Sequence, residues 1–145
     1  MTDDYSARLS AKLAPETVTV ALVRAGALLT GYELLKGPIV REPKSFLAEE
    51  WDALGEPVPS PTYLRDVRSL DRSPFRASVK WLQSMDALTA EHAESLERIH
   101  EHRGDVAHEL ARVLIDPDVD IRVDLLLELR AVSYTHLTLP TNREV

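Results

Sequence analysis

The chain has 145 residues, no cysteine and a formal net charge of −7, and 44% of its residues are hydrophobic. That length suits one compact domain, and that hydrophobic content is sufficient for a core, which argues against a disordered chain. The lack of cysteine excludes disulfides and thiolate metal sites. The acidic balance argues against a protein that coats itself in nucleic acid, although it is compatible with a local basic site.

The first third of the chain predicts one long apolar helix. Residues 1–14 are polar and mixed, and we expect them to fray. From Glu16 to Leu35 the sequence is apolar nearly all round, which is typical of a buried central helix. Gly37-Pro38 should then break or kink this helix. No cleavable leader and no apolar run long enough to span a bilayer is evident, so we expect a cytoplasmic protein without a membrane partner.

The rest of the chain predicts further helices separated by clear breaks. Residues 52–63 contain one glycine and three prolines and predict a loop. Ser73 followed by Pro74, and then Thr89, are typical helix starts, and Asp116-Pro117 should open a last leucine-rich helix. No alternating strand pattern is present. The prediction is therefore an all-α fold, a four- to five-helix up-down bundle, with residues 1–132 as a single domain.

Residues 133–145 abandon the helical pattern abruptly. Their sequence, SYTHLTLPTNREV, resembles translated sequencing-adaptor read-through from a metagenome-derived reading frame. We therefore expect an artefactual tail outside the natural fold, with a natural disordered tail as the alternative.

The segment EHRGDVAHEL, residues 101–110, is the most informative stretch of the chain. Arginine carries a permanent charge on a planar fork that suits phosphate oxygens, and histidine suits proton transfer near neutral pH. Arg103 and His108 could therefore cleave a phosphodiester without a metal. The spacing alone is weak evidence, because it should occur by chance in roughly a third of chains this long.

Arg103 also has a purely structural interpretation. It follows Leu96 and Ile99 on the apolar stripe of its helix, where a cation needs a partner or a ligand. It could reach the surface, or pair with Glu91, Asp105 or a carboxylate from another helix. Gly104 should weaken the helix locally and suggests a bend, a close helix contact or backbone exposed beside a ligand.

The segment resembles the signature of the HEPN superfamily, small helical domains of prokaryotic toxin–antitoxin and abortive-infection systems. The preceding apolar helix, with Arg24-Ala-Gly-Ala-Leu-Leu-Thr-Gly-Tyr-Glu-Leu-Leu-Lys36, and the Asp-Pro turn after the motif are similar in layout. The chain departs from the pattern at Gly104, where active members usually have a polar residue such as asparagine.

The resemblance implies metal-independent RNA cleavage at the interface of a homodimer, with an antitoxin protein as a further partner and no cofactor. Arg103 would bind the scissile phosphate, and His108 would act as general acid or base to give a 2′,3′-cyclic phosphate. His102 and Asp105 are the substrate-binding candidates. Two alternatives stay open: a catalytically inactive HEPN-like module that dimerises or binds a partner, and an unrelated helical scaffold.

Two other clusters suggest weaker sites. His92, His100, His102 and His108 lack the spacing of four residues that helical zinc pairs favour, so we expect no metal site. A basic stretch precedes and enters the helix after Ser73. It could track a phosphate backbone, but a solvated surface paired with nearby carboxylates is the favoured interpretation. Its members are Arg65, Arg68, Arg72, Arg76 and Lys80.

Overall fold

The computed structural model describes residues 2–133, and the regular secondary structure in this range is helical. The all-α prediction is confirmed. One isolated bridge joins Trp51 and Pro57. The elements are α1 (Thr2–Lys12), α2 (Pro15–Phe46), α3 (Pro61–Tyr63), the short π-helix η1 (Leu64–Arg68), α4 (Pro74–Ser84), α5 (Ala90–His108), α6 (Leu110–Ile115) and α7 (Val123–Ser133). The predicted tail lies outside the described residues, except that Ser133 ends α7.

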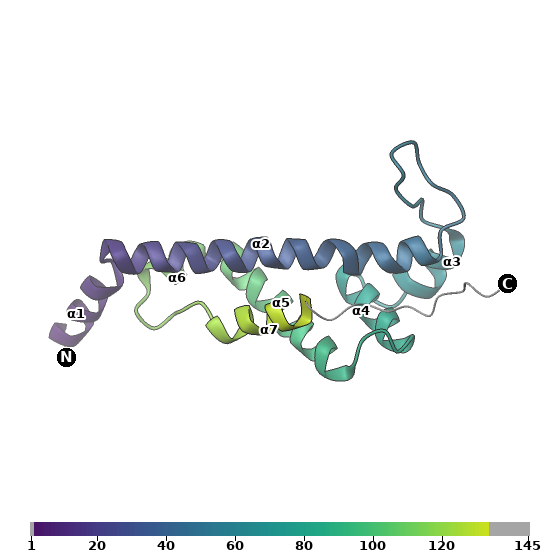
Figure 1. The fold of residues 1–145 in the computed structure, drawn as a ribbon. Coiled ribbons are helices and arrows are strands. Elements are labelled where there is room, and N and C mark those ends of the chain that lie inside the picture. Colours follow the sequence, from purple (N-terminus) through teal and green to yellow (C-terminus); the bar gives the residue numbers. More distant parts are fainter. Residues whose placement is uncertain (1, 134–145) are drawn as a thin grey trace.

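The 32-residue helix α2 runs the length of the molecule, and α4, α5 and α7 pack against one side of it (Figure 1). The predicted break at Gly37-Pro38 is wrong, because Pro38 and Pro43 both lie inside the continuous helix. Gly37 and Pro38 are exposed. Water can therefore satisfy the backbone carbonyl that Pro38 leaves without a donor, which lowers the cost of an internal proline.

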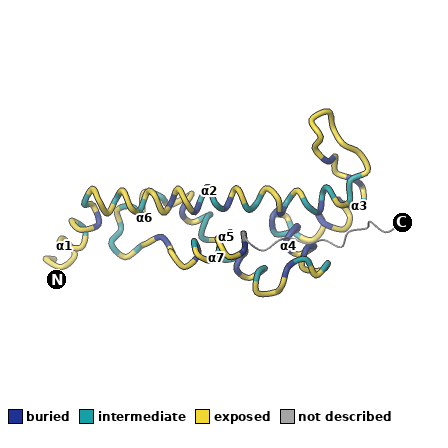
Figure 2. Tube along the Cα trace, viewed as in Figure 1, coloured by how far each residue is buried: buried dark blue, intermediate teal, exposed yellow. Residues whose placement is uncertain are grey.

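The prediction that this helix is buried all round is also wrong. Its buried residues form a single stripe, whereas the opposite face is open to solvent (Figure 2). Val23 is 65% exposed and Leu34 is 73% exposed on that open face. By length and composition α2 could also cross a membrane, which differs from the expectation that no segment is long and apolar enough. The buried stripe of α2 consists of Ala25, Leu28, Tyr32, Ile39 and Pro43.

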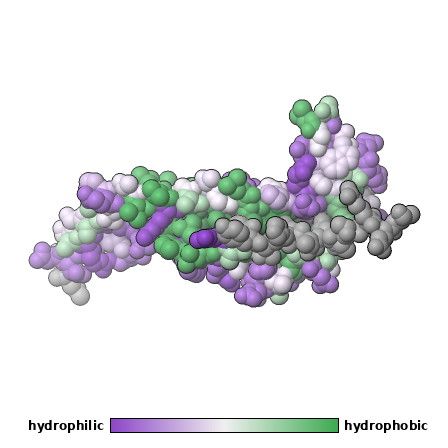
Figure 3. Space-filling model, in the orientation of Figure 1, coloured by the Kyte–Doolittle hydropathy of each residue, from purple (hydrophilic) through white to green (hydrophobic). Residues whose placement is uncertain are grey.

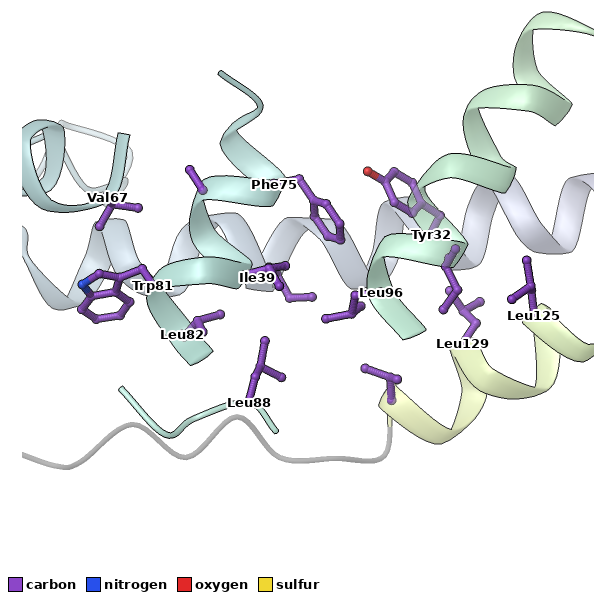
Figure 4. Close-up of a cluster of buried hydrophobic side chains, with 14 of the residues drawn as sticks. Tyr32, Ile39, Val67, Phe75, Trp81, Leu82, Leu88, Leu96, Leu125 and Leu129 are labelled. Atoms are coloured by element: carbon purple, nitrogen blue, oxygen red, sulfur yellow. The ribbon is translucent and has the colours of Figure 1, made fainter. Parts of the chain in front are cut away.

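The core forms where α2, α4, α5 and α7 meet. Figure 4 shows Ile39 of α2 among Leu82 of α4, Leu96 of α5 and other buried side chains. A smaller cluster joins Leu28 of α2 to Val106 of α5. Together they fix α5 across α2, which determines where the motif of residues 101–110 lies.

Two of the three predicted helix starts are confirmed. The Ser73 side chain accepts a hydrogen bond from the Arg76 amide, and the Thr89 side chain accepts one from the His92 amide at 3.1 Å. Asp116-Pro117 instead closes α6, and the Asp116 carboxylate accepts the Asp118 amide at 2.9 Å. The last helix therefore begins only at Val123.

The N-terminal residues form α1 instead of a frayed lead-in. Lys12 at its end is buried, and its Nζ donates to the carbonyl of Val119 at 2.6 Å and pairs with Asp120. Arg8 pairs with Asp118. These contacts with the segment between α6 and α7 hold α1 in place, and composition gave no sign of them.

Candidate functional site

Arg103 turns toward α2 and is held there. Its Nη2 donates to Glu33 Oε1 at 2.9 Å, and its guanidinium lies 5.3 Å from the centroid of the Tyr32 ring. The side chain is 34% exposed. This matches the structural interpretation in which Arg103 pairs with a carboxylate from another helix. Its Nε is buried and has no hydrogen-bond partner within the described chain.

Tyr32 and His100 form the polar centre beneath this ion pair. The Tyr32 hydroxyl lies 2.6 Å from His100 Nδ1, and the His100 ring stacks on Phe75 with centroids 5.0 Å apart. Burial raises the pKa of Tyr32 to about 12. Burial, and next the charge of Arg76, lowers the pKa of His100. At neutral pH the pair is therefore an uncharged phenol and an uncharged imidazole.

Arg76 of α4 and Glu97 of α5 complete this group. Arg76 Nε lies 2.8 Å and 3.1 Å from the two Glu97 oxygens, and Glu101 lies at the limit of pairing distance, 4.0 Å. We call the group the α2–α5 polar cluster. Its two arginines face two glutamates, so its cations are already compensated within one protomer. Its members are Tyr32, Glu33, Arg76, Glu97, His100 and Arg103.

His108 does not join Arg103. It is the last residue of α5, it is exposed, and its side chain makes no hydrogen bond or ion pair with the described part of the chain. A separation of five residues turns a side chain by about 140° around an α-helix. The predicted catalytic pair therefore points in two directions within one protomer.

His102 and Asp105 do not converge on Arg103 either. His102 Nε2 accepts the backbone amide of Arg122 at 3.1 Å, which ties α5 to the residue before α7. Burial, and next the charge of Arg122, lowers the pKa of His102. Asp105 is exposed, and its backbone carbonyl accepts the Glu109 amide at 2.8 Å. His102 thus has a structural contact, and Asp105 is a surface carboxylate.

Gly104 provides neither the bend nor the close helix contact that we considered for it. It lies within α5, and a Cβ built on it would meet nothing within 4 Å. The interruption comes at Glu109 instead, where φ is −118° and ψ is 28°. Gly31 is the glycine that permits close packing, because a Cβ there would overlap the side chain of Leu129.

Four of the five cations in the basic stretch are paired with nearby acceptors, and the fifth, Arg72, is exposed. Arg65 pairs with Asp66 at 2.7 Å and Lys80 pairs with Asp71 at 3.0 Å. Arg76 belongs to the α2–α5 polar cluster, and Arg68 donates to backbone carbonyls. This arrangement matches the paired, solvated surface and not a continuous track of available cations.

Sequence reasoning missed His100 and the role of Tyr32. A signal existed, since Glu97, His100 and Arg103 follow one another at steps of three residues and so share one side of α5. The partner residues on α2 and α4 could not be read from that spacing. In residues 2–133 no group of three or more histidines or acids is placed to hold a metal ion.

Comparison with known proteins gives no relative. No protein-family model, no curated protein and no solved structure matches this chain. The local geometry therefore carries the functional argument.

Proposed function

We propose that this chain is a HEPN-like interaction module that dimerises or binds a partner and does not cleave RNA. The observation that carries the proposal is the intramolecular engagement of Arg103 by Glu33 and Tyr32. An arginine that binds a scissile phosphate must offer its donors to the substrate. Here the donor at Nη2 is taken by a carboxylate of the same protomer.

The positions of the other motif residues support the same proposal. His108 lies about 140° around α5 from Arg103, so no single approach of a phosphate reaches both side chains in one protomer. His102 is already hydrogen-bonded to the backbone of Arg122. Gly104 supplies no polar group where active members of the family usually have one. In this role Arg103 anchors α5 on α2.

The second candidate function is the metal-independent endoribonuclease of a toxin–antitoxin or phage-defence system. The exposed side chain of His108 at the end of α5 favours it, because a general acid or base must be accessible. A second protomer would then have to bring its own Arg103 or His108 to the same phosphate. An RNA target would fit a cytoplasmic location.

The test is cleavage of a labelled structured RNA by the purified full chain in EDTA. We expect no cleavage by the wild type, and none by Gly104→Asn, because Glu33 still occupies Arg103 in that variant. Cleavage to cyclic-phosphate ends by the wild type, lost in His108→Ala, would overturn the proposal in favour of the endoribonuclease. His92→Ala is the matched control, because His92 lies outside the motif on the same helix.

A further inference from the structure

The exposed face of α2 carries a regular stripe. Its positions alternate in steps of four and three residues, the spacing of the a and d positions of a coiled coil. All eight side chains are exposed. Six of them are apolar, small or a threonine, and one charged residue lies at each end. The α2 stripe consists of Glu16, Val20, Val23, Ala27, Thr30, Leu34, Gly37 and Arg41.

The α2 stripe lies on the side of the helix away from the core. The buried stripe includes Leu28 and Tyr32, and at 100° per residue the centres of the two stripes are about 160° apart. Helices α4, α5 and α7 pack on the buried side of α2 (Figure 1). Apolar surface is visible along this outer edge of the molecule in Figure 3. From Val23 onward the described chain therefore leaves the stripe uncovered, whereas at its N-terminal end Glu16 and Val20 are exposed beside a groove that Val113 and Ile121 also line.

We propose that the α2 stripe binds the same stripe of a second copy of this chain, with the two helices antiparallel. The stripe is self-complementary in that direction. When the two-fold axis passes between Ala27 and Thr30, each a position faces a d position, as antiparallel pairing requires. Ala27 then faces Thr30, Val23 faces Leu34, and Val20 faces Gly37, so that large side chains meet small or medium ones.

The charges at the two ends of the stripe support the antiparallel direction. In this register Glu16 of one copy faces Arg41 of the other, and this happens twice in the dimer. Parallel pairing would instead place Glu16 against Glu16 and Arg41 against Arg41, which repel. Arg41 has a side chain that is 51% exposed beside Glu56, so it can reach a further carboxylate.

The length of the stripe suits such a contact. From Glu16 to Arg41 it covers about 38 Å of helix at a rise of 1.5 Å per residue. A spacing of 3.5 residues favours helices that cross at about 20°, which keeps them in contact over that length. This inference deepens the proposed interaction role and rests on it, since it names the partner as a second copy.

Disulfide trapping tests the direction of pairing, because the chain has no cysteine of its own. In the double variant Val23→Cys, Leu34→Cys, we expect rapid crosslinking to a covalent dimer under mild oxidation. The single variant Val23→Cys should stay uncrosslinked, because position 23 faces position 34 in the antiparallel pair. Crosslinking of the single variant would show parallel pairing and would overturn the proposal.

Light scattering after size-exclusion chromatography tests the surface itself. We expect a wild-type dimer, and a loss of affinity of roughly 100-fold or more in Leu34→Asp, which buries two unpaired carboxylates. Leu54→Asp is the matched control, because Leu54 is 89% exposed in the loop between α2 and α3. Circular dichroism should show that both variants keep the helical content of the wild type.

The possible outcomes separate the two proposals. A wild-type monomer would overturn the proposed pairing of the α2 stripes, and so would a dimer that Leu34→Asp leaves intact. The RNA cleavage assay tests the proposed function separately. Sedimentation of the wild type with phosphatidylcholine vesicles, lost in Leu34→Asp, would overturn it in favour of a membrane surface. A dimer that cleaves RNA would keep the pairing and overturn the silent module.

Discussion

At the scale of single residues, two histidines of α5 take part in the packing of the fold. His100 stacks on Phe75 and lies 2.6 Å from the Tyr32 hydroxyl, and His102 accepts the Arg122 amide. Burial is the first cause that lowers the pKa of both rings. The His102 contact requires an unprotonated Nε2, and burial disfavours the charged form of both rings, so protonation opposes folding at these two positions.

This arrangement predicts that the protein becomes less stable as pH falls below about 6.5, the ordinary pKa of histidine. The unfolded chain binds protons at both rings before the folded chain does, so the free energy of unfolding decreases as pH is lowered toward the folded-state pKa values. Urea unfolding between about pH 7.5 and pH 5.5 measures this slope.

The variant His102→Gln should make that slope smaller, because burial lowers the pKa of this ring in the folded protein. An identical slope in the wild type and in His102→Gln would show that the His102 ring does not contribute to the pH dependence.

The residue types of this site were readable from the sequence, but their partners were not. Arg103 was expected to need a partner or a ligand, but the carboxylate with which it pairs, Glu33, lies 70 positions away along the chain.

At the scale of elements, two glycines within helices should respond in opposite ways to alanine. Gly104 has open space around it, so Gly104→Ala should raise the free energy of unfolding by up to about 1 kcal/mol through helix propensity. Gly31→Ala should lower the free energy of unfolding, because its Cβ would displace Leu129 where α2 and α7 meet.

Chemical denaturation of the two variants beside the wild type measures both effects. A Gly104→Ala variant less stable than the wild type would contradict this, because it would mean that residue 104 adopts a backbone conformation that alanine disfavours. Equal stability of Gly31→Ala and the wild type would show that α7 packs more loosely than the geometry indicates.

The sequence predicted the start of a helix correctly where the interaction that starts it lies within a few residues. Ser73 and Thr89 cap their helices because a hydroxyl satisfies an amide within three residues. The end of α2 was mispredicted because the cost of Pro38 depends on which face of the helix it occupies. Likewise, Asp116-Pro117 forms a turn around the Asp116 carboxylate and not a helix start.

At the scale of the whole molecule, one long helix supports everything else on one of its faces. Its apolar content suggested burial on all sides, but residues 2–133 cover one side of this helix and leave the opposite side exposed (Figure 2). Composition reports how much surface is apolar and not which part another element covers. The exposed half therefore became visible only in the folded structure, and it is the surface proposed to bind a second copy.

The same distinction applies to α1. Its sequence is polar, yet it is anchored by the buried Lys12 to Val119 and Asp120 more than 100 residues away. Contacts between distant segments decide whether such a terminus is ordered. They also decide whether a cation such as Arg103 is an anchor or is available to a ligand.

The most direct test of the central claim is the stability of Arg103→Ala, measured by urea unfolding beside Glu33→Ala and the double variant. If Arg103 anchors α5 on α2, Arg103→Ala should lose about 1 kcal/mol, through lost contact with Tyr32 and a partly exposed ion pair. The two single losses should then be less than additive in the double variant. An Arg103→Ala variant as stable as the wild type, or more stable, would contradict the account, because a cation kept for a ligand costs stability when the ligand is absent.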